Sequence, residues 1–308
     1  MPSLLPLHRG GGAPGWDNVG HNPGFHWSAV SGIPWIRCPE TEEGDGRVQI
    51  GTFVALGDSF TEGLDDPRAD QAGYLGWADR FAQMLAAEQP GLRYANLAVR
   101  GKLLGQVAAE QVPQAIAMAP DLVSLAAGGN DLLRFRSDPD ALAQTFDDTV
   151  RTLLMAGCQV VIFTGFDPRF PVLRLLRGQV AAYNMHLRAI ADQHGCHVVD
   201  LWSMPVLRDP RAWSADRLHL TPDAHRRVAL RACEVLGVAV AEDWRAPWPA
   251  GDTVTGGVAA SGRAAWLAAR RMDVRWARLH AAPWVARWVR GISSGDEIDP
   301  KRPELLPL

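Results

Sequence analysis

The sequence predicts an α/β protein in which a parallel sheet of five strands lies between two layers of helices, a three-layer α/β/α arrangement. Two observations predict this fold class. Five short apolar runs are continuous rather than alternating, which is typical of strands buried on both faces of a sheet. Segments with apolar residues at helical spacing separate these runs, and strands that alternate with helices favour one parallel sheet with helices on both faces.

The first three predicted strands end at small or polar residues that interrupt the apolar run. The first run breaks at Gly57, the second at Arg100-Gly101, and the third at Gly128-Gly129-Asn130-Asp131. Such clusters are typical of turns. The five predicted strands are residues 49–56, 93–99, 122–127, 160–164 and 197–201.

The helices are predicted from apolar periodicity and from the proline and glycine residues at their ends. The first helix carries an apolar face and stops at Pro90-Gly91. Pro113 is expected to kink or divide the second. Proline follows Asp138 and Thr221 directly, which is typical of a helix start. The predicted helices are residues 74–88, 104–118, 138–157, 178–194 and 221–236.

Two segments of different character flank the α/β domain, which we assign to residues 47–240. Residues 1–46 contain nine glycines and six prolines, a composition typical of irregular chain. They are either a tail that docks on the main domain or sequence upstream of the true start. Residues 241–308 form a basic extension, with seven arginines and one acid between Arg263 and Arg290.

The basic extension contains a predicted helix with an apolar stripe. We favour a helix that packs on the α/β domain and exposes its arginines, because small residues suit close packing against protein. The alternative is that residues 263–290 lie on an anionic membrane surface or an acidic partner. Residues 293–308 are expected to form an extended polar end. The stripe consists of Ala265, Ala269, Met272, Trp276 and Leu279.

The overall composition excludes several classes of protein. A net charge of −3 with 21% charged residues argues against nucleic acid as the main partner. The four cysteines are scattered, which suits free thiols in a reducing compartment. No apolar run approaches the ~20 residues that span a bilayer, and no signal-peptide core is evident. We therefore expect a cytoplasmic enzyme or binding protein.

Residues able to carry chemistry follow the predicted strands. Ser59, Gly101, Asn130 and the pair Asp216 and His219 would all gather at one edge of a parallel sheet, where open α/β sheets bind their ligands. A serine between glycines can present both its hydroxyl and its N–H to a ligand. An ordinary Asp-Ser-Thr-Gly turn is the alternative.

Four segments in this arrangement resemble the sequence blocks of the GDSL, or SGNH, hydrolases. The resemblance covers roughly residues 48–238, and the blocks occur in family order. Ala224 departs from the pattern, because many members carry glycine before the second histidine, here His225. The blocks are Gly57-Asp58-Ser59-Phe60-Thr61, Asn96-Leu97-Ala98-Val99-Arg100-Gly101, Gly128-Gly129-Asn130-Asp131 and Asp216-Arg217-Leu218-His219-Leu220-Thr221-Pro222.

The resemblance implies a flavodoxin-like fold and a serine hydrolase site without metal or organic cofactor. Ser59 would be the nucleophile and His219 its base, since a neutral imidazole titrates near the working pH. Asp216 would fix the tautomer of that imidazole. The oxyanion hole would consist of the backbone N–H groups of Ser59 and Gly101 and the side-chain amide of Asn130.

Other polar residues are expected to have structural roles. Asp58 and Asp131 would order the turns by bonding nearby N–H groups. His225 lies one turn into the last helix, which favours a structural role. His194, Cys196 and His197 are close in sequence but straddle a helix end and a strand start, so we do not expect a metal site there.

The expected function is hydrolysis of small-molecule carboxylic esters through an acyl-serine. An acyltransferase that uses the same acyl-enzyme is one alternative. A non-catalytic module that binds carbohydrate or acyl ligands is the other. Specificity is expected to depend on residues 65–73, 166–177 and 202–215, which carry no readable preference for one acyl or alcohol group.

Overall fold

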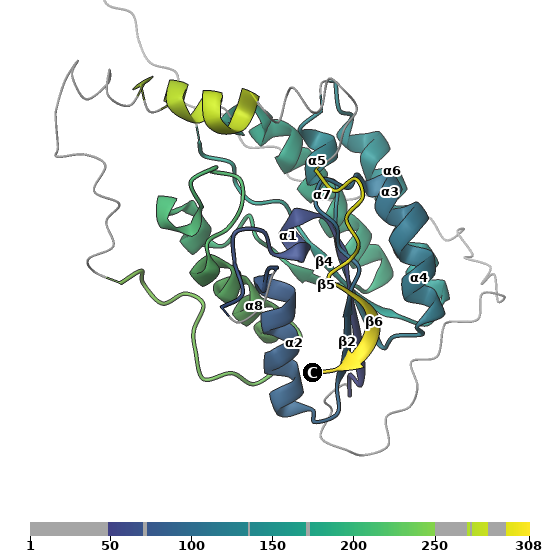
Figure 1. Ribbon diagram of the computed structural model, residues 1–308. Helices are drawn as coiled ribbons and strands as arrows, with labels where there is room; N and C mark the ends of the chain where they lie inside the picture. Colours follow the sequence, from purple (N-terminus) through teal and green to yellow (C-terminus); the bar gives the residue numbers. More distant parts are fainter. Residues whose placement is uncertain are drawn as a thin grey trace, which may run out of the picture. The chain divides into compact units, whose positions relative to one another are not determined.

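The centre of the structure is a six-stranded sheet with the strand order β5-β4-β3-β1-β2-β6. The computed structural model describes residues 49–69, 73–134, 136–170, 173–249, 270–271, 273–282 and 294–308 (Figure 1). The predicted segment 1–46 lies outside these residues. The strands are β1 (Thr52–Gly57), β2 (Arg93–Asn96), β3 (Leu122–Ala126), β4 (Gln159–Phe163), β5 (His197–Val199) and β6 (Arg302–Pro307).

The first five strands are parallel, which confirms the predicted fold class. Their order, β2-β1-β3-β4-β5, is that of flavodoxin-like proteins. The chain crosses from β1 to β2 on one side and later to β3 on the other. β1 is therefore the strand beside which a crevice opens at the carboxyl edge of the sheet.

Helices cover both faces of the sheet. α2 and α8 pack on one face, and α4, α6 and α7 pack on the other (Figure 1). None of the described helices is long and apolar enough to cross a membrane. The α-helices are α1 (Ser59–Glu62), α2 (Gly76–Glu88), α3 (Leu104–Gln106), α4 (Val112–Ala117), α5 (Gly129–Leu132), α6 (Pro139–Met155), α7 (Arg177–His194) and α8 (Pro222–Val235).

Strand β1 shows why its apolar run is continuous. Phe53 and Ala55 pack among the apolar side chains of α2 and α8, whereas Val54 and Leu56 pack among those of α6 and α7. Since successive side chains of a strand point to opposite faces, a strand covered on both faces needs apolar residues at every position.

The helix predicted over residues 104–118 is divided, as its proline suggests. α3 is followed by a π-helical turn, η1 (Val107–Gln111), in which the N–H of Val112 bonds to the carbonyl of Val107. α4 then begins with Pro113 in its first turn. Proline has no N–H to donate to the preceding turn, so it is tolerated at a helix start rather than inside a helix.

The sixth strand corrects the predicted count of five. Residues 302–307 were expected to be an extended polar end, but they pair antiparallel with β2. Pro303 and Pro307 lie within this strand, which is compatible with its position at the edge of the sheet. Of its six residues only Leu305 is buried. Two adjacent leucines among charged residues and prolines do not alternate, so the pattern is too weak to predict a strand.

The basic extension also contributes a helical segment that contacts the α/β domain within residues 270–282. The indole N–H of Trp276 donates to the carbonyl of Asp216 at 2.8 Å, and Arg217 pairs with Asp273 at 2.8 Å. Leu279 is 59% exposed, so the predicted stripe is wrong at this position. Ala265, Ala269 and Met272 lie outside the described residues. An anionic surface as partner stays a prediction.

The C-terminal strand is anchored by a lysine that is largely buried. Lys301 Nζ donates to the carbonyl oxygens of Glu62 and Leu75, at 2.7 and 2.8 Å, and pairs with Asp79 at 2.8 Å. Glu62 is the last residue of α1. The extension therefore supports the short helix that follows β1.

We predict that Lys301→Met lowers the free energy of unfolding by about 2 kcal/mol, because it takes the donor from two carbonyl oxygens and removes one of the three donors to the buried carboxylate of Asp79. Thermal unfolding measures the change. Glu304→Gln, at an exposed position of the same strand, is the matched control. Equal melting temperatures of the two variants would contradict the anchoring role.

Candidate active site

The turn after β1 is forced into one shape by close backbone packing. Gly57 has φ of 149°, and a Cβ at this position would lie 2.4 Å from the carbonyl oxygen of Ala126. The side chain of Gln111 bonds both polar groups of Gly57, accepting from its N–H and donating to its carbonyl, each at 2.9 Å. Only glycine fits here.

Ser59 comes directly after this turn, at the start of α1. Asp58 caps the helix, because its carboxylate accepts the N–H of Phe60 at 3.1 Å. This is the turn-ordering contact that the sequence predicts for Asp58. The cap and the glycine turn together fix the direction in which the Ser59 side chain leaves the backbone.

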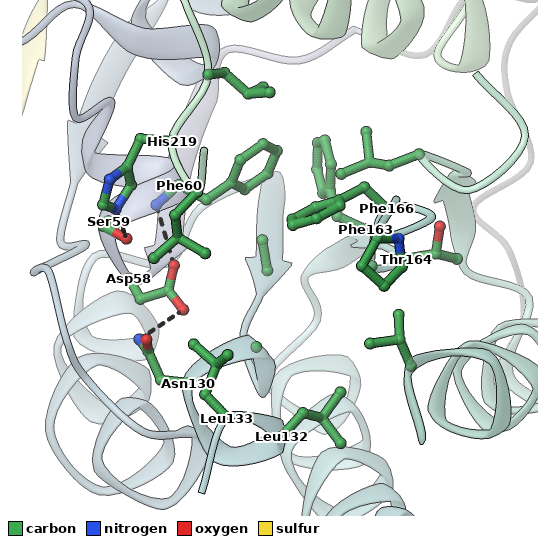
Figure 2. Close-up of a pocket in the computed structure, with 18 of the residues that line it drawn as sticks. Asp58, Ser59, Phe60, Asn130, Leu132, Leu133, Phe163, Thr164, Phe166 and His219 are labelled. Atoms are coloured by element: carbon green, nitrogen blue, oxygen red, sulfur yellow. Dashed lines mark hydrogen bonds between the residues drawn. The ribbon is translucent and has the colours of Figure 1, made fainter. Parts of the chain in front are cut away.

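The loop before α8 brings a histidine to Ser59. His219 Nε2 lies 3.0 Å from Ser59 Oγ, and His219 Nδ1 lies 2.5 Å from Asp216 Oδ2 (Figure 2 shows the pair of Ser59 and His219). The second carboxylate oxygen of Asp216 accepts the backbone N–H groups of Leu218 and His219 and the hydroxyl of Ser214. The carboxylate is thereby held in position from within its own loop.

Asp216 and His219 stabilise each other's charged forms. Burial raises the pKa of Asp216, but the hydrogen bond and the charge of His219 outweigh this and hold the pKa below its usual value. For His219, burial lowers the pKa, and the hydrogen bond and charge of Asp216 outweigh it and raise the pKa above its usual value. Asp216 is therefore ionised throughout the working range of pH.

Asn130, which follows β3, contacts the turns that follow β1 and β2. Its side-chain amide donates to Asp58 Oδ2 at 3.1 Å and to the carbonyl oxygen of Lys102 at 3.0 Å (Figure 2 shows the bond to Asp58). Gly101, the neighbour of Lys102, has φ of 76° in the turn after β2. The structure therefore brings Asn130 to the residue before Ser59 and to the residue after Gly101.

Asp58 has an unusual environment for a carboxylate. Burial raises its pKa to about 6, and the N–H of Phe60 and the charge of His219 oppose this only in part. The sequence did not predict its contact with Asn130, because the two residues are 72 positions apart. Asp131 accepts the N–H of Leu104 at 3.0 Å, in agreement with its predicted structural role.

Two residues near His219 were missed by the sequence reasoning. The hydroxyl of Ser214 lies 2.5 Å from Asp65 Oδ2 and 2.7 Å from Asp216 Oδ1, so it connects the loop after α1 to the loop of His219. Asp65 falls in a segment expected only to affect specificity. A backbone φ of 66° at this non-glycine residue is a feature that side-chain patterns do not predict.

The described residues contain one grouping that could hold a cation: Asp65, Asp216 and His219, whose ligand atoms lie within 4.8 Å of one another. His194, which the sequence reasoning weighed as a ligand, bonds to Asp147 at 2.6 Å instead. His225 accepts the N–H of Trp77 and donates to the carbonyl of Leu64, in agreement with a structural role.

A cavity of about 160 Å³ opens beside Ser59. Ser59, Asn130 and His219 lie at one side of it, and Phe163, Thr164 and Phe166 lie across from them (Figure 2). The cavity thus begins at the residues that the sequence singled out and extends over the carboxyl ends of β3 and β4. The side chains able to react therefore lie at one end of the cavity.

Comparison with solved structures supports the fold. An acetylxylan esterase of Geobacillus stearothermophilus is 21% identical, with a TM-score of 0.53 over 64% of this chain and 98% of that one. An α/β hydrolase from the metagenome of Lake Arreo, Spain, is 22% identical, with a TM-score of 0.53 over 61% and 95% of the two chains. No curated protein matches the sequence.

A sequence model of one family spans the whole arrangement. The description of that family is GDSL-like Lipase/Acylhydrolase, and the match covers residues 55–227. This range includes the turn after β1 and the loop of His219. The chain therefore belongs to the GDSL-like lipase/acylhydrolase family and is a hydrolase of ester bonds.

Proposed function

We propose that the protein hydrolyses carboxylic esters through an acyl-serine intermediate formed on Ser59. The observation that carries this proposal is the unbroken series of contacts from Ser59 Oγ to His219 and on to Asp216. A serine hydroxyl is a poor nucleophile until a base removes its proton. His219 Nε2 lies within hydrogen-bond distance of that proton.

The reaction divides into two proton-coupled steps. Ser59 Oγ attacks the ester carbonyl while its proton moves to His219 Nε2, and the same proton then passes to the alkoxide that leaves. Water attacks the acyl-serine in the second step and gives a proton to His219. That proton returns to Ser59 Oγ as the carboxylic acid departs, so the enzyme is restored.

Asp216 would orient the imidazole rather than take its proton. Its carboxylate lies against Nδ1, which favours the tautomer with a free lone pair on Nε2, and its negative charge stabilises the imidazolium that forms. The N–H groups of Leu218 and His219 bind the other carboxylate oxygen and prevent the carboxylate from rotating away.

The oxyanion would be bound by the backbone N–H groups of Ser59 and Gly101 and the amide of Asn130. Both hydrogens of that amide are bonded, to Asp58 and to Lys102, so the substrate oxygen would replace one of these acceptors. Asp58 is the acceptor that can change its charge, since burial raises its pKa to about 6.

The two alternative functions make different use of the same residues. An acyltransferase would pass the acyl group from Ser59 to an alcohol instead of water. A non-catalytic binding module would have no need of the contact between Ser59 and His219, and that contact therefore favours an enzyme.

We predict that Ser59→Ala lowers ester hydrolysis by about 10⁶-fold and abolishes covalent labelling by a fluorophosphonate probe, since no other group replaces the nucleophile. Hydrolysis of p-nitrophenyl esters and the circular dichroism spectrum of the variant measure activity and folding. Ser203→Ala, which changes a serine bonded to the carbonyl of Asp200, is the control. A folded Ser59→Ala protein that still turns over would refute the assignment.

We predict that Asp216→Asn costs on the order of 10⁴-fold in kcat and His219→Ala on the order of 10⁶-fold. The base acts when it is neutral, so kcat/KM of the wild type rises with pH through a pKa above the usual 6.5. Without the negative charge of Asp216 this pKa falls, and the acid limb of the profile moves to lower pH. An acid limb that stays in place would contradict the role of Asp216.

We predict that EDTA leaves ester hydrolysis unchanged, because the nucleophile, base and orienting carboxylate act without a cation. Activity assays with and without the chelator test this. A reversible loss that Zn²⁺ restores, together with an equal loss in Asp65→Ala, would instead assign a cation to the grouping of Asp65, Asp216 and His219.

A further inference from the structure

The cavity beside Ser59 is apolar over most of its wall. Beyond the reactive end it is bounded by side chains from α5, from the end of β4 and from α7, together with the loop that precedes α8. Leu132 and Leu133 form one side, and Phe163 and Phe166 form another (Figure 2). Val180 of α7 also lines it.

The polar side chains of this wall are already bonded within the protein. Thr164 Oγ1 donates to Asp200 at 2.8 Å, and Tyr183 Oη donates to the carbonyl of Ala127 at 3.2 Å. The indole N–H of Trp213 donates to the carbonyl of Leu207 at 2.8 Å.

The backbone of Gly165 is satisfied in the same way, because Asn184 accepts its N–H and donates to its carbonyl. A sugar hydroxyl at this part of the wall would therefore lose its bonds to water and meet side-chain donors that are already engaged. A loss of this kind costs about tenfold or more in affinity.

The volume of the cavity indicates how large an apolar group it can hold. At about 160 Å³ it is comparable with an engineered apolar cavity of about 150 Å³ in another protein, which stays dry and binds benzene. A group of about six carbons therefore fits. Each methylene that moves from water into such a site improves binding by up to about fourfold.

The chemistry decides which end of an ester occupies the cavity. The acyl group stays attached to Ser59 between the two steps, whereas the alcohol must leave and water must take its place next to His219. An apolar cavity that held the alcohol would hinder that exchange. The acyl group suits an apolar cavity, because it does not move until the second step is complete.

We propose that this cavity is the acyl subsite, and that the enzyme prefers esters of apolar acids with about six carbons or more over acetyl esters and esters of sugar acids. This inference rests on the proposed acyl-serine mechanism. Because four further methylenes separate a hexanoyl from an acetyl group, kcat/KM should rise by about 10² between them.

The test measures kcat/KM for two series of esters. One series varies the acyl group of p-nitrophenyl esters from acetyl to dodecanoyl, and the other varies the alcohol of acetate esters over the same lengths. The proposal expects a steep rise in the acyl series and a shallow one in the alcohol series. A maximum at acetyl, or a steep rise in the alcohol series alone, would overturn it.

Two variants that narrow the cavity check its location. Val180→Phe and Leu176→Trp change lining residues on α7 and on the 3₁₀ turn before it, η2 (Leu173–Leu176). Each should lower kcat/KM for the hexanoyl ester at least tenfold and leave that for the acetyl ester within about twofold. Leu175→Trp adds the same bulk at a neighbouring position that is 85% exposed, and it should change neither value.

The outcomes separate this inference from the proposed function. Should acetyl esters be the best substrates while Ser59 still reacts with a fluorophosphonate, the acyl subsite is wrong and the acyl-serine mechanism stands. Should Ser59 react with neither ester nor probe, both are wrong. Equal losses on both esters in the two folded cavity variants would also overturn the subsite.

Discussion

The site depends on the close approach of two backbones at the end of β1. Gly57 lies so near the carbonyl of Ala126 that no side chain fits between them, and the Gln111 amide bonds both polar groups of Gly57. The chain can leave the sheet in one direction only. Asp58 and Ser59 follow immediately, so the position of the nucleophile is set by packing between β1 and β3 rather than by the loop itself.

The other parts of the site are held to this turn by polar contacts between segments that are far apart in sequence. Glu62, at the end of α1, accepts the backbone N–H of Arg100 at 2.7 Å and pairs with its guanidinium. Asn130 connects the turns after β1, β2 and β3. Buried polar networks of this kind are costly when they are incomplete, and they specify one arrangement when every member is paired.

The fold class could be predicted from the sequence because strands buried on both faces need continuous apolar runs. Helix limits followed from proline and glycine. The sixth strand could not be predicted, since its two prolines and single buried leucine resemble a loop. The pairing of β6 with β2 depends on tertiary packing, which no local sequence pattern predicts.

In the candidate site, too, local patterns could be predicted from the sequence and long-range contacts could not. The blocks around Ser59, Asn130 and His219 could be recognised because each is a short local pattern. The contact between Ser214 and Asp65 could not, because it joins residues 149 positions apart in two irregular loops. The helical segment with Trp276 was expected to pack through an apolar stripe, yet it contacts the loop of Asp216 through a hydrogen bond and an ion pair.

The pairing of β6 with β2 bears on how the chain reaches its folded state. Arg93 bonds to the carbonyl of Leu305, which follows it by 212 residues, so this contact closes a very long loop and is expected to form late. Until then β2 has a free edge, with unpaired N–H and carbonyl groups that can pair with the same strand of another copy. A chain that lost its last strand would therefore be prone to aggregate while folding, even where its finished site was intact.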